Sequence, residues 1–481
     1  MPVPPTLWRK TMDKLKFIVP DWDDIVDPGF DFINERHSED YRRDKYVYGA
    51  RLWHVFRGEP PVDGVLVSRP AVEPKIKLIE SVGGIRGFFR VPSGLNRDRF
   101  QVIADCGAWQ YRMQDRPPYE PIETLSFYEL LGVDYGVSVD HIAFYGNAAE
   151  RIRLTYENAV KSFEEWKRGY ERGEYNFILL AAVQGLRVED YVKYMKRLYE
   201  RGVRHFALGG LGPRTSEFLN RLVEAIVKVF KGSEGIEKIH ILGVARPSLI
   251  SVYRKLTEIA EEVSFDNATY LRVAWMRSRG NYITLDGKSY TAIRVRRGSQ
   301  GEEEVLEILR SYAEGSIGLK EAMNVLIDYV SKNGESEYVP FYAATLRDKP
   351  WEKCPCPICK SVGVEVIIFR GNDRNRRRGF HNLYVFYNLL KRGACSFRFA
   401  LQRIDSYGVK GRSSDALAEA LKSRGIDAKV KRILVVAHCT AEKEVDGEQV
   451  RRVLARAGLP LPGFDLERED EYAKILRKFM K

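Results

Sequence analysis

The middle of the chain repeats one pattern, in which a short apolar run is followed by an amphipathic stretch long enough for a helix. Strands are predicted at 64–68, 102–106, 136–139, 177–183, 205–208, 239–244 and 262–265, and helices at 150–168, 189–200 and 216–231. From 102 onward the runs recur every 23 to 41 residues, which is typical of a parallel sheet with crossover helices. This pattern predicts an α/β fold and favours a closed (β/α)8 barrel, or TIM barrel, over an open doubly wound sheet.

Changes in composition divide the rest of the chain. Residues 1–60 are rich in aromatic, proline and acidic residues, and we expect an ordered but irregular N-terminal lead-in. The barrel itself is expected at 61–345, and 346–405, which holds a cysteine cluster, is expected to form an inserted subdomain that completes it. Residues 410–481 are predicted to form a small C-terminal α/β element, with helices at 414–424 and 469–480 and a strand at 432–437.

The composition is that of an ordinary globular protein. Of the 481 residues 44% are hydrophobic and 30% charged, which argues against disorder. The longest apolar runs, such as 177–183 and 433–437, are too short to cross a bilayer, and the first residues contain no continuous apolar run typical of a secretory signal. We therefore expect a cytoplasmic protein with no membrane partner. Its net charge of +12 fits an acidic partner such as a nucleic acid but does not require one.

Three of the six cysteines crowd into Cys354, Cys356 and Cys359, and His381 follows 22 positions after the last of them. Thiolate and imidazole are the ligands that zinc prefers, and four such groups complete a closed tetrahedral site. The alternative is three buried or free thiols near an unrelated histidine, which the crowding makes a poor explanation. The subdomain at 346–405 is therefore predicted to bind one structural Zn²⁺ ion.

Three aspartates, Asp105, Asp140 and Asp266, each follow directly on an apolar run. In a (β/α)8 barrel the carboxyl ends of the strands meet at one mouth, where catalytic side chains lie. Small-residue turns at 107–108, 184–185 and 209–210 would let backbone approach a planar ligand closely. Strand-end aspartates can equally cap the helices that follow them, so this pattern by itself names no reaction.

A series of short motifs occurs in a characteristic order through this region. They are DCGAWQ at 105–110, VSVD at 137–140, VQG at 183–185, ALGGLG at 207–212, GVARP at 243–247, FDNATYLR at 265–272, the C-x-C-x2-C cluster and the pair at 381–382. In this combination the chain, from roughly 60 to 400, resembles the tRNA-guanine transglycosylase superfamily. The segments PDWDDIVDPGFDF, ADCGAWQYR and YGVSVDH are more similar to the DNA-guanine transglycosylases, which insert 7-cyano-7-deazaguanine into DNA.

The resemblance implies a double displacement that exchanges guanine in a polynucleotide for a 7-deazaguanine. Asp266 would be the nucleophile, Asp105 the general acid and base, and Asp140 the acceptor for the base's amino and ring N–H groups. Further base-binding residues would be Gln184, Gly209, Gly210, Leu211, Gly107, Ala108 and Trp109. The expected partners are DNA or tRNA and the free 7-deazaguanine, and a homodimer would be compatible with this reading.

Arginines near these motifs are candidates for phosphate contacts. They are Arg370, Arg374, Arg376, Arg377 and Arg378 inside the cysteine segment, and Arg272, Arg277 and Arg279 after the predicted nucleophile. The alternative for the run at 370–378 is a solvated loop. Three other functions stay open at this point: a tRNA-guanine transglycosylase of the queuosine or archaeosine type, a non-catalytic partner subunit, and a zinc-stabilised nucleic-acid-binding module on an inert barrel.

Overall fold

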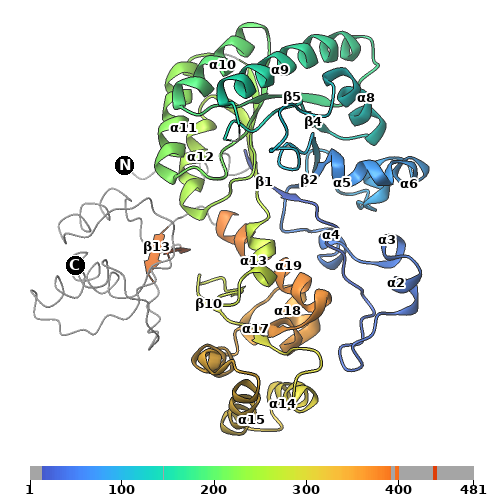
Figure 1. The fold of residues 1–481 in the computed structure, drawn as a ribbon, viewed down its shortest axis with the longest axis vertical. Coiled ribbons are helices and arrows are strands. Elements are labelled where there is room, and N and C mark those ends of the chain that lie inside the picture. Colours follow the sequence, from blue (N-terminus) through green and yellow to red (C-terminus); the bar gives the residue numbers. More distant parts are fainter. Residues whose placement is uncertain (1–13, 145, 234, 392–395, 400–436, 441–481) are drawn as a thin grey trace, which may run out of the picture.

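A computed structural model describes residues 14–144, 146–233, 235–391, 396–399 and 437–440. Eight parallel strands close into a barrel in chain order, which confirms the predicted (β/α)8 fold (Figure 1). They are β1 (Leu15–Pro20), β2 (Gly64–Ser68), β3 (Gln101–Asp105), β4 (Tyr135–Val137), β5 (Ile178–Val183), β6 (His205–Leu208), β7 (Ile236–Ile241) and β8 (Ala260–Asp266). The ring closes where β1 pairs with β8, so that Ile18 lies beside Asp266.

The first strand lies inside the segment predicted to be an irregular lead-in, and that prediction is wrong for Leu15–Pro20. Phe17 and Ile18 on this strand are fully buried. The strand contains a lysine, Lys16, ends in a proline and precedes an acidic turn, so its sequence carries little strand signal. Its pairing with β2 and β8, which are distant in sequence, makes it part of the barrel.

Helices cover the outside of the barrel. The long ones are α8 (Pro121–Leu131), α9 (Ala148–Glu171), α10 (Val188–Glu200), α11 (Ser216–Phe230) and α12 (Ile250–Leu256), and the helices predicted at 150–168, 189–200 and 216–231 are among them. Short helices fill the connections after β1 and β2: α2 (Glu39–Arg43), α3 (Lys45–Tyr48), α4 (Leu52–Val55), α5 (Arg69–Val72), η1 (Glu73–Lys75), α6 (Ile76–Ser81) and α7 (Ile85–Phe88). No helix in the described ranges is both long and apolar enough to span a membrane.

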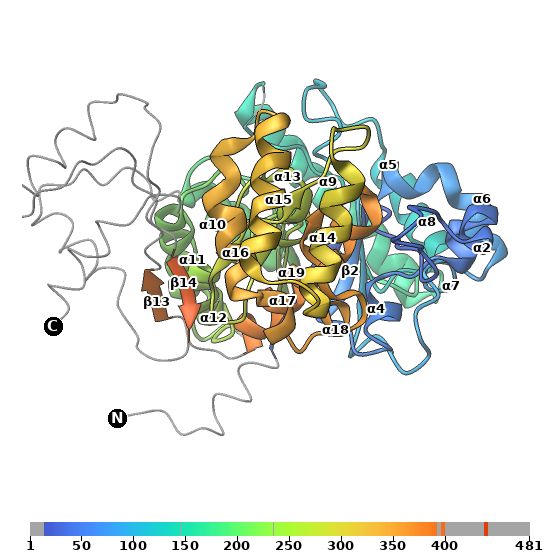
Figure 2. The same cartoon turned by 90° about the horizontal axis from the view of Figure 1, so that it is seen from below.

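A helical layer follows β8 and lies against one side of the barrel (Figures 1 and 2). Its helices are α13 (Thr269–Met276), α14 (Glu302–Glu314), α15 (Leu319–Lys332), η3 (Ser336–Tyr338), α16 (Val339–Asp348), α17 (Pro350–Lys353), α18 (Pro357–Val362), η4 (Gly363–Ile367) and α19 (Gly371–Lys391). The short helix η2 (Pro247–Leu249) lies before β8 and contacts α11 and α12 instead. Short strand pairs join these helices, β9 (Tyr282–Ile283) with β10 (Ser289–Tyr290) and β11 (Ile293–Arg294) with β12 (Ile368–Phe369).

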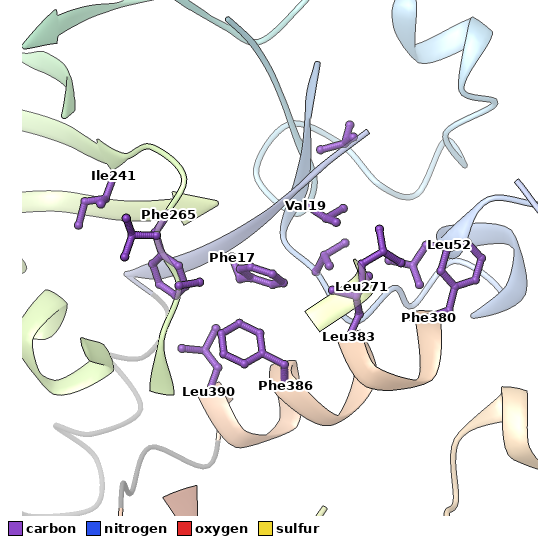
Figure 3. Packing of buried hydrophobic residues seen from close by; sticks show 14 of the residues in the cluster. Phe17, Val19, Leu52, Ile241, Phe265, Leu271, Phe380, Leu383, Phe386 and Leu390 are labelled. Carbon is purple, nitrogen blue, oxygen red and sulfur yellow. The ribbon is translucent and has the colours of Figure 1, made fainter. Parts of the chain in front are cut away.

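Helix α19 packs its apolar face directly on the barrel where β1 and β8 meet (Figure 3). The rings of Phe386 and Phe17 lie 4.8 Å apart in an edge-to-face arrangement, and Leu383 and Phe380 continue the buried face. The helix thereby covers the pair of strands that closes the ring. The segment around the cysteine cluster is thus coupled to the strand that ends at Asp266.

Side chains in layers fill the barrel interior. Because successive residues of a strand point to opposite faces, Gln101, Ile103 and Asp105 on β3 face inward, as do Glu262, Ser264 and Asp266 on β8. A polar layer lies at the amino end, where Lys238 pairs with Glu262 and donates to Gln101 Oε1 at 2.6 Å. An apolar layer contains Ile18, Leu66, Ile103, Val137, Leu180, Ala182 and Ala207. The three carboxylates therefore lie at the carboxyl ends of the strands, above a closely packed layer of apolar side chains.

The predicted C-terminal α/β element falls almost entirely outside the described residues. Only β14 (Ala437–Thr440) is described there, and it pairs antiparallel with β13 (Ser396–Phe399). The helices expected at 414–424 and 469–480 and most of the strand expected at 432–437 lie outside the described ranges, and they stay predictions.

Candidate active site

The carboxyl ends of the barrel strands bring the three predicted aspartates together. Asp105 is the last residue of β3, Asp266 the last of β8, and Asp140 follows β4 by three positions. The negative charges of Asp140 and Asp266 both raise the pKa of Asp105, so the three carboxyl groups share one electrostatic environment. Their environments nevertheless differ in ways that suit different chemical tasks.

Asp105 is poised to exchange a proton near neutral pH. Burial raises its pKa to about 7, and the neighbouring carboxylates add to that effect. Hydrogen bonds from Ser68 and from the backbone N–H of Gly107, at 2.9 Å, act in the opposite direction and hold the carboxyl in place. A carboxyl group with this pKa can both donate and accept a proton during one reaction cycle.

Asp266 is held through a single oxygen. Its Oδ1 accepts from the backbone N–H of Gly243 at 2.8 Å and lies 3.3 Å from His240 Nε2. The other nitrogen of this histidine, Nδ1, lies 2.8 Å from Ser264 Oγ. Burial lowers the pKa of His240, so the ring is neutral at pH 7. Its Nε2 lies beside the Asp266 carboxylate but forms no aligned hydrogen bond among the described residues. The contacts of Asp266 with Gly243 and His240 both involve Oδ1. Its Oδ2 therefore remains available as a nucleophile.

Asp140 is a buried hydrogen-bond acceptor with both oxygens oriented by neighbours. Gln184 Nε2 donates to Oδ2 at 2.6 Å, and Cys106 Sγ donates to Oδ1 at 3.1 Å. Burial raises the pKa of the Cys106 thiol well above its usual value, so Cys106 stays protonated and acts as a donor. Tyr111 supports this group from behind by donating to the backbone carbonyl of Asp140 at 2.7 Å.

The Gly209–Gly210 turn lies directly against Gln184. A Cβ atom at Gly209 would come within 2.4 Å of Gln184 Nε2, and one at Gly210 within 2.4 Å of Oε1. Gly210 also has a φ of +67°, which glycine adopts at little cost. Tyr191 holds the turn by donating to the carbonyl of Gly209 at 2.8 Å. The two glycines therefore admit the Gln184 amide against the turn, and among the described residues its Oε1 is buried without a hydrogen-bond partner.

The other predicted base-binding residues occupy distinct places around this group. Gly107 adopts a φ of +75° at the end of β3, and Leu211 is buried next to the glycine turn. Ala108 packs on the small apolar cluster that contains Cys106, Tyr111 and Val139. Trp109 is 56% exposed, with the Arg112 guanidinium 4.3 Å from its ring centroid, so its aromatic face is accessible from solvent.

Sequence analysis missed the residues that position the carboxylates. His240 and Ser264 occupy inward positions in the apolar runs IHI and VSF, and both are completely buried. A polar residue at such a position needs a hydrogen-bond partner inside the protein, and this requirement was the available signal. Ser68, at the end of β2 beside Asp105, is a further residue that positions a carboxylate and that sequence analysis missed.

Cys354, Cys356, Cys359 and His381 form one buried cluster, with their ligand atoms all within 4.8 Å of one another. His381 Nδ1 lies 3.5, 3.4 and 3.4 Å from the three sulfur atoms in chain order. A tetrahedral zinc site with ordinary Zn–S and Zn–N bonds has S···N edges of about 3.6 Å, so the spacing fits. His381 Nε2 is 2.7 Å from the carbonyl of Ile283, the outer contact that commonly orients a ligating histidine. The cluster could therefore hold a metal ion.

Four of the five arginines in the predicted phosphate-binding run are buried, which contradicts that prediction for Arg370, Arg374, Arg377 and Arg378. Arg374 pairs with Glu35 and with Glu365, each at 2.6 Å. The others bind carboxylates or carbonyls on the β1–β2 connection, on α13 and at the start of α14. The reason for the error is that α19 turns these side chains inward, where they join it to neighbouring segments. Arg376 is partly exposed and lies 3.8 Å from Asp24.

Replacing Arg374 with alanine should therefore affect stability rather than any contact with phosphate. The change removes one of the two cations that pair with the buried Glu365 carboxylate, because Arg310 remains 2.8 Å from its other oxygen. Losing part of such a buried ion-pair network costs about 2–3 kcal/mol of unfolding free energy. Urea unfolding of the variant measures the loss, with the exposed Arg277→Ala as the control that stays within about 0.5 kcal/mol of the parent. Unchanged stability together with a flatter salt dependence of DNA affinity would contradict this assignment.

The remaining arginines lie near the end of β8. The Arg272 guanidinium lies over the Trp22 ring, 4.9 Å from its centroid, and Arg277 is exposed just after α13. Arg279 packs over Tyr338 and Phe341. Arg272 and Arg277 are thus accessible at the side of the mouth that carries Asp266.

Comparison with known proteins agrees with this geometry. The chain is 32% identical over 427 residues to a curated relative named DNA-guanine transglycosylase from Salmonella montevideo, in an alignment that covers 79% of this chain and 97% of the relative. No family model matches the chain. Identity at this level over nearly the whole relative, together with the confirmed barrel, places the chain in the DNA-guanine transglycosylase family, as a pentosyltransferase that exchanges bases.

Proposed function

We propose that this protein replaces a guanine in DNA with a 7-deazaguanine, 7-cyano-7-deazaguanine, through a covalent glycosyl-enzyme. The observation that carries the proposal is the group of three carboxylates at one barrel mouth, each in a different environment. Asp266 is anchored through one oxygen, Asp105 has a pKa of about 7, and Asp140 is a buried acceptor. DNA is proposed as the polynucleotide because the relative is named for it.

The first displacement uses Asp266 as nucleophile and Asp105 as acid. Asp266 Oδ2 forms a bond to the anomeric carbon while the bond from that carbon to guanine breaks. The electron pair of the broken bond goes to the departing base, which takes the proton of Asp105. In the second displacement a ring nitrogen of the incoming base attacks the same carbon, releases Asp266 and gives its proton to Asp105. Two displacements at one carbon retain the sugar's configuration.

Recognition of the base rests on Asp140, Gln184 and the Gly209–Gly210 turn. Asp140 accepts hydrogen bonds from the amino and ring N–H groups of the base, while Gln184 and the backbone N–H of Gly210 bind its carbonyl edge. The second N–H of Gln184 Nε2 supports this role, because the amide has two N–H donors and the contact with Asp140 uses one of them. Gly107, Ala108, Trp109 and Leu211 line the remaining surface of the base.

The cysteine cluster is proposed to hold one structural Zn²⁺ ion. All four ligands come from the protein, which leaves no coordination position for substrate. When bound, the ion would join α18 to α19, and α19 packs against β1 and β8. Its contribution would be mechanical, because it supports the strands beneath Asp266.

Purified protein should contain about one zinc per chain, with three sulfur ligands and one nitrogen ligand. Elemental analysis gives the stoichiometry, and X-ray absorption gives the ligand set. Cys356→Ser should lose the metal and lower the unfolding temperature, because structural zinc contributes on the order of 10 kcal/mol to local folding. Cys106→Ser, which changes a buried thiol outside the cluster, is the matched control that should keep the metal. Substoichiometric zinc in untagged protein would contradict the assignment.

The decisive experiment is guanine exchange with labelled base, run in parallel on DNA and on unmodified tRNA. We expect the labelled base to be incorporated into DNA only, and, when 7-cyano-7-deazaguanine is supplied instead, mass spectrometry should find it in the product DNA. Exchange on tRNA alone would assign the protein to the tRNA-modifying function. Exchange on neither, with polynucleotide binding intact, would indicate a non-catalytic subunit or an inert binding module.

A further inference from the structure

Trp22 is an exposed aromatic residue beside the candidate active site. It follows β1 by two residues, and β1 pairs with β8, the strand that ends at Asp266. Its side chain is 51% exposed even though the Arg272 guanidinium lies 4.9 Å from the ring centroid. Met276, one turn further along α13 on the same helix face as Arg272, is 64% exposed. Trp22 and Arg272, the indole platform, combine an aromatic face and a cation.

The turn that carries Trp22 is held firmly on both sides. Asp21 pairs at 2.6 Å with Arg51, which is buried, and its backbone N–H donates into β2. Asp23 pairs with Lys75 at 2.8 Å and adopts a φ of +58°, a conformation that costs an aspartate of order 1 kcal/mol. The acidic neighbours of Trp22 are thus neutralised and fixed, while the indole alone is turned to solvent. Strain and ion pairs that hold an aromatic ring out in water indicate a binding role rather than a packing role.

We propose that the indole platform stacks the base next to the target guanine, within an unpaired stretch of DNA. This inference rests on the proposed function. A guanine inside a duplex must leave its stack to reach Asp266, and its neighbour then loses a stacking partner. An indole ring replaces that partner for any base, because every base has a π face. Arg272 can meanwhile contact the phosphate that joins the two nucleotides, because its position over Trp22 places it beside the same step.

The proposal makes DNA the occupant for reasons of charge and position. The platform presents a cation, and the acids beside it are paired with Arg51 and Lys75, so it does not repel a phosphate backbone. It also borders the strand end that carries the proposed nucleophile. An apolar protein partner at this place would cover the mouth through which the polynucleotide must enter.

The test is a double-mutant cycle between Trp22 and the neighbouring base, with single-stranded oligonucleotides that the wild-type protein exchanges. Trp22→Ala should raise KM roughly 5- to 150-fold, with little change in kcat, and Trp22→Phe should restore most of the loss. An abasic site on one side of the target guanine should raise the wild-type KM similarly. The same abasic site should add little to the KM of Trp22→Ala, because the stacking contact is already absent. Ile33→Ala, at a residue 74% exposed, is the surface control.

The outcomes separate this inference from the proposed function. The platform alone is overturned if the wild-type protein exchanges the intact oligonucleotide but the effects of Trp22→Ala and of the abasic site on KM are additive. This must hold for an abasic site on either side of the target guanine. An unchanged KM in Trp22→Ala does the same. No exchange of any DNA by the wild-type protein overturns the proposed function, and the platform with it.

Discussion

Replacing Asp266 with alanine should abolish base exchange and leave no covalent adduct with DNA. The carboxylate is the only group in the proposed mechanism that bonds to the sugar, so its removal eliminates the intermediate. Loss of the nucleophile reduces turnover by roughly a millionfold in other covalent enzymes. Asp266→Asn should fail as well, because an amide oxygen is a far poorer nucleophile than a carboxylate. Denaturing electrophoresis of the wild-type protein with DNA should show a band that hydroxylamine or added 7-deazaguanine releases.

Glu261→Ala is the matched control for this experiment. Glu261 is an exposed carboxylate on the same strand, so its removal tests for a general effect of charge on β8. The control should form the adduct at the wild-type rate. Circular dichroism of Asp266→Ala should show an intact fold, because the side chain lies at the barrel mouth and its hydrogen bond there comes from the backbone N–H of Gly243. If Asp266→Ala still forms the band, the nucleophile lies elsewhere, and Asp105 becomes the first candidate.

The barrel could be predicted because its strands are buried on both faces. Such strands appear in the sequence as short continuous apolar runs, as in ILLAAV of β5, and amphipathic helices separate them. β1 lacked this signal, because Lys16 interrupts its apolar run LKFIV and the acidic turn after it suggests a loop. Its place in the barrel depends on hydrogen bonds to β2 and β8, and pairings between distant segments leave little trace in local sequence.

The positions of the site residues could be predicted where a catalytic side chain follows directly on a strand. Asp105 and Asp266 end their strands, so their position at the mouth follows from the fold. The arginine run shows the opposite case, because its sequence displays the charges but not their partners. Glu35, which binds Arg374, comes from the far end of the chain, and only the fold brings the two together. A charge run is therefore weak evidence for a surface when distant acids can pair with it.

Asp105→Asn should keep DNA binding and slow base exchange by roughly a hundred- to ten-thousandfold, the usual contribution of a general acid–base group. The asparagine retains an oxygen that can accept from the backbone N–H of Gly107, so the turn at the end of β3 should persist. It cannot deliver a proton to the departing guanine or take one from the incoming base. DNA affinity measured by fluorescence anisotropy should therefore stay close to the wild-type value while kcat falls.

The pH dependence of the same reaction identifies the group that loses its proton. Because burial raises the pKa of Asp105 to about 7, the carboxyl stays protonated below that pH and ionises above it. The first displacement needs the protonated form, so kcat/KM for DNA should be level below about pH 7 and fall tenfold per unit above it. In Asp105→Asn this descending limb should disappear, since an amide does not titrate there. Rates measured from pH 5.5 to 9 define both profiles.

A carboxyl outside the group of three aspartates could produce a similar limb, and it supplies a control. Burial also raises the pKa of Asp24 to about 7, and this residue lies on the turn after β1, paired with Arg376. Asp24→Asn removes that titration and should leave the limb at pH 7 in place, whatever it does to the absolute rate. If the limb persists in Asp105→Asn but vanishes in Asp24→Asn, the pH dependence arises from Asp24. Asp105 is then not the proton donor. A limb that vanishes only with Asp105 assigns the proton to the carboxyl that faces Asp140 and Asp266, where the departing base must receive it.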